Sequence, residues 1–194
     1  MQITLSLPAW ATTELAALPD YMPTLEERMA AVIKFSRLNF EHETGGPFAA
    51  GVFEKKSGKL IVIGVNRVVP SNCSSAHAEI VTISLAQKII GSFDLGAAGL
   101  PEHQLVVNAR PCAMCYGSIP WSGVTELVVA GTGKDVEELT GFDEGPVHPD
   151  WIGELNKRGI SVIENIMRDE ACAVLHDFGA SNALVYNGRL GQQT

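Results

Sequence analysis

Apolar residues recur at helical spacing in several long segments of the chain. After a capping box formed by Thr24 and Glu27, they repeat every three or four residues up to the Gly45-Gly46-Pro47 breaker. A second segment continues from Ala76 to Gly91 without an interrupting Gly or Pro, and a third lies near the C-terminus. The pattern predicts helices with one buried face, formed by Ala78, Val81, Leu85 and Ile89 in the second segment and by Met167, Ala171, Val174, Leu175 and Phe178 in the third.

Short apolar runs predict the strands. Phe48 to Phe53 and Leu60 to Val65 flank a turn at Ser57-Gly58, which indicates a hairpin. Further runs predict strands at 105–108, 124–130 and 160–163, and helices at 111–119, 134–140 and 150–158 lie between or beside them. Strands that alternate with helices after a hairpin predict an α/β fold, a three-layer α/β/α sandwich with a central mixed sheet.

Breaks in the pattern suggest three parts of the chain. Pro8, Pro19 and Pro23 predict an irregular N-terminal arm over residues 1–23. The periodic segments then define a single domain over residues 24–180, and residues 181–194 form a C-terminal tail.

Composition narrows the class of protein. The chain has 194 residues, 46% of them hydrophobic and 19% charged, which suits one domain with a substantial core. No apolar run approaches the roughly 18 residues of a membrane span, and the first residues do not resemble a secretory signal, so we expect a cytoplasmic protein with no membrane partner. The net charge of −8 disfavours a nucleic-acid partner.

Two short motifs carry the candidate chemistry. His77-Ala78-Glu79 opens one predicted helix, and Pro111-Cys112-Ala113-Met114-Cys115 opens another. On a first helical turn, cysteines three residues apart place their sulfurs on one face, and the helix N-terminus favours thiolates. One imidazole and two thiolates leave a fourth position open, so we predict a catalytic Zn²⁺ held by His77, Cys112 and Cys115.

Glu79 lies two residues after His77 and therefore need not be a ligand. A carboxylate there can take a proton from a zinc-bound water and pass it to a ring nitrogen and then to a departing amine, while the hydroxide attacks the carbon that bears the amino group. His-x-Glu followed by Pro-Cys-x-x-Cys is the known pattern of zinc deaminases, so the sequence predicts hydrolytic deamination of a small nucleobase.

With these residues in place, residues 24–180 resemble the cytidine and deoxycytidylate deaminase superfamily, which implies a cytidine deaminase-like fold. Three further segments resemble its bacterial guanine deaminase branch. They are Gly46-Pro47-Phe48-Ala49-Ala50, Asn66-Arg67-Val68 and Gly141-Phe142-Asp143-Glu144-Gly145. The resemblance implies conversion of guanine to xanthine and ammonia, with side activity on ammeline, a triazine whose ring edge imitates guanine.

The resemblance also implies roles for individual residues. Phe48 lines the base pocket, Asn66 hydrogen-bonds the ring, and Glu144 serves as a second catalytic acid. Ala78, Trp121 and Asp143 complete the predicted substrate-binding set. Each assignment has a structural alternative: Phe48 and Trp121 would pack in the core, Asn66 would turn the chain after a strand, and acids in a Gly/Pro loop would be solvated.

The tail segment Tyr186-Asn187-Gly188-Arg189 is similar to one that guanine deaminases of this type exchange between subunits, which implies a homodimer. Several alternatives remain open. Deaminases of guanosine, of cytidine or cytosine, and of adenosine in transfer RNA share all four zinc-site residues. A different class is a zinc-stabilised binding module, in which a fourth protein ligand would close the metal site and Glu79 would have no catalytic role.

Overall fold

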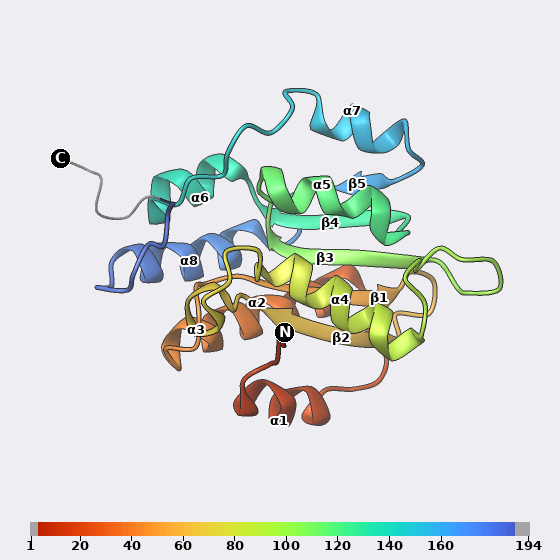
Figure 1. Cartoon of the computed structure of the whole chain (residues 1–194), viewed down its shortest axis with the longest axis horizontal. Coiled ribbons are helices and arrows are strands. Elements are labelled where there is room, and N and C mark those ends of the chain that lie inside the picture. The colour runs from red at the N-terminus through yellow and green to blue at the C-terminus, as the bar shows by residue number, and fades with distance from the viewer. Residues whose placement is uncertain (1–3, 189–194) are drawn as a thin grey trace.

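A five-stranded mixed sheet lies at the centre of the computed structural model, which describes residues 4–188 (Figure 1). The strand order is β2-β1-β3-β4-β5. β1 is antiparallel to both β2 and β3, whereas β3, β4 and β5 run parallel. The strands are β1 (Ala49–Glu54), β2 (Leu60–Val65), β3 (His103–Ala109), β4 (Glu126–Gly131) and β5 (Ser161–Ile163).

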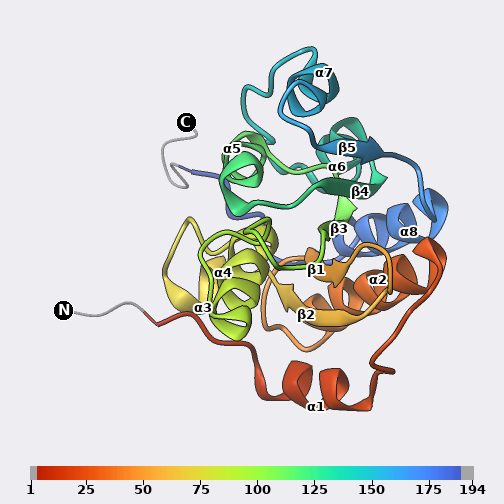
Figure 2. The same cartoon turned by 90° about the vertical axis from the view of Figure 1, so that its right-hand side faces the viewer.

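Helices cover both faces of the sheet, which confirms the predicted three layers (Figure 2). Side chains alternate along each strand, so Ala49 and Phe53 of β1 join the hydrophobic core on one face while Ala50 and Val52 join the other. None of the helices in the described part of the chain is long and apolar enough to cross a membrane. One face carries α1 (Ala9–Ala17), α2 (Leu25–Glu41) and α8 (Arg168–Gly179), and the other carries α4 (Ala78–Ile90), α5 (Ala113–Ser122) and α7 (Trp151–Asn156).

The shorter helices α3 (Val68–Ser71) and α6 (Gly133–Thr140) follow directly after β2 and β4. The sequence pattern did not predict α3, because four residues are too few to show a helical period. In α4, Ile89 is 59% exposed, so its predicted place on the buried stripe is wrong. The helix instead turns Thr82, Ile83 and Ala86 inward.

The expectation of an irregular arm is also wrong for part of residues 1–23. Ala9–Ala17 form α1, with Pro8 at its N-cap, where the missing N–H of proline costs nothing. Ala11 is fully buried, and Glu14 pairs with Lys34 of α2 at 2.6 Å. The boundaries of the arm, the domain and the tail stay predictions, but the helix packs on the domain rather than lying free of it.

Strand direction determines where polar side chains can gather. β2, β3 and β4 all end at one edge of the sheet, where β1 begins, as the pairs Ala49↔Val65 and Ala109↔Gly131 show. The segments that follow these strands lead into α4 and α5, so both helices begin at this edge. Candidate residues far apart in sequence therefore meet there.

Candidate metal centre and substrate pocket

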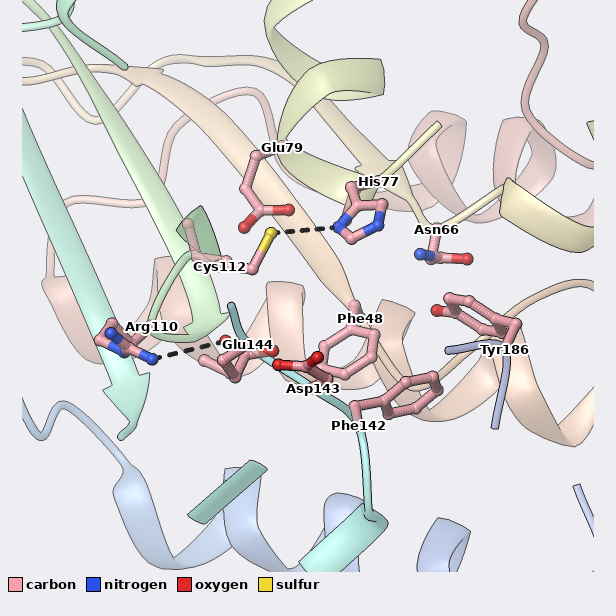
Figure 3. Close-up of a pocket in the computed structure, with 13 residues that line it drawn as sticks. Phe48, Asn66, His77, Glu79, Arg110, Cys112, Phe142, Asp143, Glu144 and Tyr186 are labelled. Atoms are coloured by element: carbon pink, nitrogen blue, oxygen red, sulfur yellow. Dashed lines mark hydrogen bonds and ion pairs between the residues drawn. The ribbon is translucent and has the colours of Figure 1, made fainter. Parts of the chain in front are cut away.

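One imidazole and two thiols meet where α4 and α5 begin, and Figure 3 shows the imidazole of His77 beside the sulfur of Cys112. His77 is the N-cap residue of α4, and Cys112 is the N-cap residue of α5. Cys115 lies in the first turn of α5 and is buried. The three ligand atoms lie within 4.8 Å of one another, and the Cys112 Sγ is 3.5 Å from the His77 Nδ1. This spacing suits three donors to one metal ion.

The local electrostatics favour a thiolate in this cluster. The hydrogen bond from Cys115, together with the contact to His77, lowers the pKa of Cys112 to about 4 even though burial acts in the opposite direction. Cys115 donates in that pair and is buried, so its pKa lies well above the ordinary thiol value. Burial acts to lower the pKa of His77, but the contacts with Cys112 and Glu79 outweigh it and raise the pKa. Cys112 is therefore the thiolate of the cluster, a negatively charged donor suited to a cation.

Glu79 lies beside this cluster without belonging to it. It is in the first turn of α4 and is only 6% exposed. Burial, reinforced by the neighbouring Cys112, raises the pKa of Glu79 above its ordinary value. A carboxylate whose pKa is raised accepts a proton more readily than an ordinary one, which suits a proton carrier.

A pocket opens next to the cluster and gathers residues from several loops. Five of the predicted site residues outside the metal ligands and Glu79 line it, namely Phe48, Asn66, Ala78, Asp143 and Glu144. The other lining residues are His77, Glu79, Val107, Ala109, Arg110, Cys112, Phe142 and Tyr186.

Asn66 directs one polar group toward the pocket. Its backbone N–H donates to the Phe48 carbonyl at 3.0 Å, and its Oδ1 accepts from the Val68 N–H at 3.2 Å. Its Nδ2 is buried and has no hydrogen-bond partner among the described residues. The side chain thus both shapes the turn after β2 and leaves a donor available at the pocket wall (Figure 3).

Phe48 belongs to an aromatic cluster beneath the pocket. Its ring meets Phe142 edge-on, with ring centroids 5.3 Å apart. Phe142 in turn stacks on Phe178 at 5.5 Å and contacts Tyr186 at 4.6 Å. Phe48 therefore packs in a core cluster and lines the pocket, so the two alternatives for this residue are compatible.

Glu144 is buried rather than solvated. It is 6% exposed, and its Oε2 lies 3.8 Å from the Arg110 Nη2 without a hydrogen bond to any described residue. Burial, together with the nearby Cys112 and Glu79, raises the pKa of Glu144 to about 8, while Arg110 acts to lower it. The neighbouring Asp143 is exposed, and its Oδ1 accepts from the Gly145 N–H at 2.9 Å.

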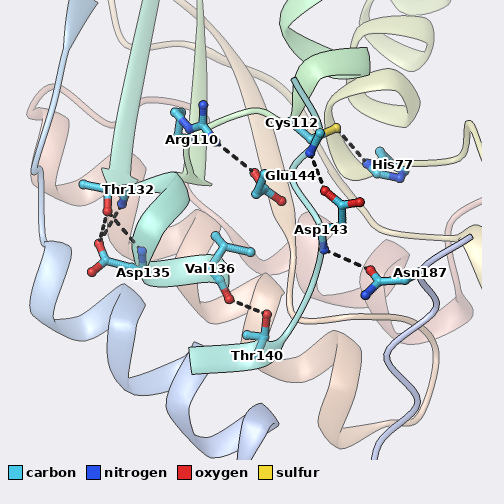
Figure 4. A network of polar contacts seen from close by, with 11 residues as sticks. His77, Arg110, Cys112, Thr132, Asp135, Val136, Thr140, Asp143, Glu144 and Asn187 are labelled. Atoms are coloured by element: carbon cyan, nitrogen blue, oxygen red, sulfur yellow. Dashed lines mark hydrogen bonds and ion pairs between the residues drawn. The ribbon is translucent and has the colours of Figure 1, made fainter. Parts of the chain in front are cut away.

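The C-terminal segment holds the Glu144 loop in place (Figure 4). Asn187 Oδ1 accepts from the Asp143 N–H at 2.9 Å, and its Nδ2 donates to the Gly141 carbonyl at 2.9 Å. Tyr186 places a buried hydroxyl against Gly46, where any Cβ would clash with it. The predicted exchange of residues 181–194 between subunits stays a prediction, and Arg189 and the residues after it lie outside the described residues.

Trp121 does not line the pocket, so its predicted place there is wrong for this chain. It is 81% exposed and borders a shallow hollow with Tyr116, Pro120 and Arg158. Gly123 ends α5 just beyond Trp121, at the helix end opposite the metal centre.

Sequence reasoning assigned no role to three polar or aromatic residues of the pocket. They are Arg110, Phe142 and Tyr186. Arg110 lies between β3 and the Cys112 motif, and this position in the sequence could have indicated that its side chain lies near the metal centre. Phe142 stood inside a segment quoted for the family resemblance. For Tyr186 only the tail resemblance pointed to the pocket, because no local pattern links it to residues so distant in sequence.

Comparison with known proteins places these features in a family. Residues 22–131 match the family model described as the cytidine and deoxycytidylate deaminase zinc-binding region. A guanine deaminase of Bacillus subtilis (strain 168) is 35% identical over 104 residues, 54% of this chain and 62% of that enzyme, so the match spans less than two thirds of the relative. A tRNA-specific adenosine deaminase of Buchnera aphidicola subsp. Schizaphis graminum is 29% identical over 136 residues, 70% of this chain and 83% of the relative.

Solved structures extend the match to nearly the whole chain. A guanine deaminase from Nitrosomonas europaea has a TM-score of 0.88 and 46% identity, and the match covers 93% of this chain and 97% of that one. A protein called NE0047 in complex with 2,6-diaminopurine has the same TM-score of 0.88 and identity of 46%, over 96% of this chain and 97% of its own.

The raised pKa of Glu144 predicts a pH-dependent stability difference. The group titrates near pH 8 when folded and near its ordinary value of 4.5 when unfolded, so the folded chain binds more protons and loses stability as pH rises between these values. Glu144→Gln removes this loss. Its melting temperature relative to the unsubstituted protein should therefore be higher at pH 8 than at pH 5, measured by calorimetry with chelator present. The exposed control Glu138→Gln should show no such trend, and a pH-independent difference for Glu144→Gln would contradict the assignment.

The two hydrogen bonds of Asn187 predict a local effect on the Glu144 loop. Asn187→Ala removes both bonds, so the amides of residues 141–145 should exchange with solvent faster, since opening no longer breaks these contacts. Hydrogen exchange followed by mass spectrometry measures this directly. Asn187→Asp, which keeps an acceptor for the Asp143 N–H but loses the donor to Gly141, should give an intermediate rate. Equal rates in all three proteins would show that the tail does not hold the loop.

Proposed function

Because the chain belongs to the cytidine and deoxycytidylate deaminase family, whose zinc-binding region its residues 22–131 match, we propose that it is a guanine deaminase. The reaction is hydrolysis of guanine to xanthine and ammonia. The observation that carries the proposal is the convergence of the His77, Cys112 and Cys115 cluster with the buried acids Glu79 and Glu144 in one pocket. The 46% identity with the Nitrosomonas europaea guanine deaminase supports the choice of substrate.

The donor set fits Zn²⁺. One imidazole and two thiols within 4.8 Å supply three of four tetrahedral positions, and the lowered pKa of Cys112 provides a thiolate without help from the ion. A zinc ion with one open position supplies hydroxide from water at neutral pH. The three donors come from the first residues of only two helices, α4 and α5. Because both helices begin at the same edge of the sheet, the donor atoms have little freedom to move apart.

Glu79 is the proposed proton carrier. Its burial beside the ligand cluster keeps solvent away and holds its pKa above the ordinary value, so it can take up a proton and release it within one turnover. The proton goes first to a ring nitrogen of the base and then to the leaving amine. Glu144 is the proposed second acid, since an oxygen of its carboxyl group can accept a hydrogen bond from the N1–H or the amino group of guanine.

The remaining pocket residues bind the base in this proposal. The free Nδ2 of Asn66 donates to an acceptor on the ring edge, and Phe48 offers an aromatic face. Ala78 opens α4, so its backbone N–H has no partner within the helix and can donate into the pocket. Asp143 shapes the loop beside Glu144 through its bond to Gly145. Ammeline, which shares guanine's ring edge, is a proposed side substrate.

We also propose that the protein is a cytoplasmic homodimer. Reduced thiols at the metal centre suit a reducing compartment. Trp121 and Met114 expose apolar surface on α5, 81% and 40% respectively, and apolar side chains grouped on one helix are typical of a contact between subunits. In a dimer formed through α5, Trp121 would be buried in the contact between subunits, whereas within one chain it is exposed and does not line the pocket.

The first experiment measures ammonia release by the zinc-loaded protein from guanine, guanosine, ammeline, cytosine, cytidine and adenine. Guanine should react, and Glu79→Gln should reduce its kcat by roughly a hundredfold or more, since general acid/base catalysis contributes about that much. Metal analysis should show unchanged zinc. The exposed control Glu138→Gln should retain full activity.

The other outcomes discriminate between the alternatives. If a different compound reacted and Glu79→Gln lost that activity, the zinc mechanism would be supported but the choice of guanine as substrate would be contradicted. Zinc release from Glu79→Gln, or no ammonia release from any of the six compounds, would favour a metal-stabilised binding module.

The homodimer predicts a change in sedimentation. Trp121→Ser should shift the protein from the mass of a dimer toward that of a monomer in analytical ultracentrifugation, because it removes a large apolar side chain from the contact. Phe93→Ser is the matched control, since Phe93 is 86% exposed but lies outside α5. A monomeric unsubstituted protein would contradict the proposal outright.

A further inference from the structure

A fully buried amide connects two segments that border the pocket. Asn39 lies in α2 with no exposed surface, where an unpaired carboxamide would be costly. Its Nδ2 donates to the Gly46 carbonyl at 2.8 Å and to the Asn66 carbonyl at 2.9 Å. Both of its amide hydrogens are therefore used, and both fix backbone that leads directly to pocket residues.

Asn66 depends on this bond for its position. Its N–H, its carbonyl and its Oδ1 are engaged by Phe48, Asn39 and Val68 respectively. Its Nδ2, buried at the pocket wall, has no hydrogen-bond partner within residues 4–188. A donor held this way is preorganised for an acceptor on a ligand, because the rest of the residue has no freedom to turn.

The bond network continues outward to the N-terminal helix. Thr44 Oγ1 lies 2.9 Å from Asn39 Oδ1 and 3.1 Å from the Asn39 carbonyl oxygen, the two acceptors within reach of its one hydrogen, and it accepts from the Trp10 Nε1 at 2.9 Å. The Thr44 carbonyl accepts from Arg67, the residue after Asn66, at 2.6 Å. Trp10 is fixed in turn by its stacking on His42, with ring centroids 5.4 Å apart. The chain of contacts runs unbroken from α1 to the pocket.

We propose that Thr44 and Trp10 are positioning residues for substrate binding, because the hydrogen-bonded chain Trp10–Thr44–Asn39 holds the Asn66 carboxamide in its binding orientation. The inference rests on the proposed function for the identity of the ligand, a purine base that presents a ring acceptor to the Asn66 Nδ2. Neither Thr44 nor Trp10 lines the pocket, so each acts through Asn39. The N-terminal helix is thereby part of the binding apparatus.

Thr44→Val tests the central residue of the Trp10–Thr44–Asn39 series of hydrogen bonds, since it keeps the shape of the side chain and removes the hydroxyl. The buried Asn39 and the half-buried Trp10 each lose a hydrogen bond, so KM for guanine should rise roughly tenfold while kcat changes less than about twofold. Thr44→Ser, which restores the hydroxyl, should return KM to the original value. Trp10→Phe, which removes the Nε1 donor together with part of the indole ring, should raise KM by about threefold. Glu14→Gln is the matched control: it breaks a different contact between α1 and α2, the pair with Lys34, and should leave KM unchanged.

A double-substitution cycle separates positioning from general stability. In an Asn66→Ala background there is no carboxamide left to orient, so Thr44→Val should raise KM no further. If Thr44→Val instead raised KM by the same factor in both backgrounds, Thr44 would act by another route and the proposal would be overturned.

Hydrogen exchange without substrate gives a readout that does not depend on the reaction. Thr44→Val should accelerate exchange of the amides of residues 45–49 and 66–68, and Glu14→Gln should not. Unchanged exchange in Thr44→Val would overturn the proposal. If the unsubstituted protein does not turn over guanine, the proposed function fails, and the exchange result alone then decides whether the chain of contacts positions Asn66.

Discussion

The chemistry of this protein depends on two helices that begin at the same edge of one sheet. Because β2 and β3 run in the same direction, the segments that follow both strands lead to this edge, where α4 and α5 begin with His77 and Cys112 at their N-caps. The positive ends of both helix dipoles therefore point at one small volume. That field favours the Cys112 thiolate, whose pKa is lowered, and the three ligand atoms lie within 4.8 Å of one another, close enough to hold one cation.

The pocket beside the metal centre contains more buried polar groups than the fold can satisfy. Asn66 Nδ2, Glu144 Oε2 and the Tyr186 hydroxyl are all buried with no hydrogen-bond partner among the described residues. Such atoms reduce the stability of an empty protein, since each has lost water without gaining a partner. A base with donors and acceptors along its edge can satisfy them together. The unpaired groups are therefore what a specific ligand site requires, and the raised pKa values of Glu79 and Glu144 belong to the same pattern.

Residues outside the two zinc-site motifs hold these groups in place, one near each end of the chain. Asn187 ties the Glu144 loop through two backbone bonds, and Asn39 ties the Asn66 segment through two more. In both cases one carboxamide bridges segments that have no regular pairing of their own. The positions of the Glu144 loop and of the Asn66 segment thus depend on two carboxamides that do not line the pocket.

The sequence alone determined the chemistry and the architecture. Ligand residue types, the spacing of His77 to Glu79 and of Cys112 to Cys115, and the alternation of strands with helices are local features, so they can be recognised without coordinates. Only the tertiary structure decided which other side chains reach the pocket. In the folded chain Trp121 is exposed, residues 9–17 of the expected irregular arm form a packed helix, Arg110 lies against Glu144, and Tyr186 lines the same pocket. Burial and the partners of a single amide arise from contacts between distant segments, and no periodicity along the chain encodes them.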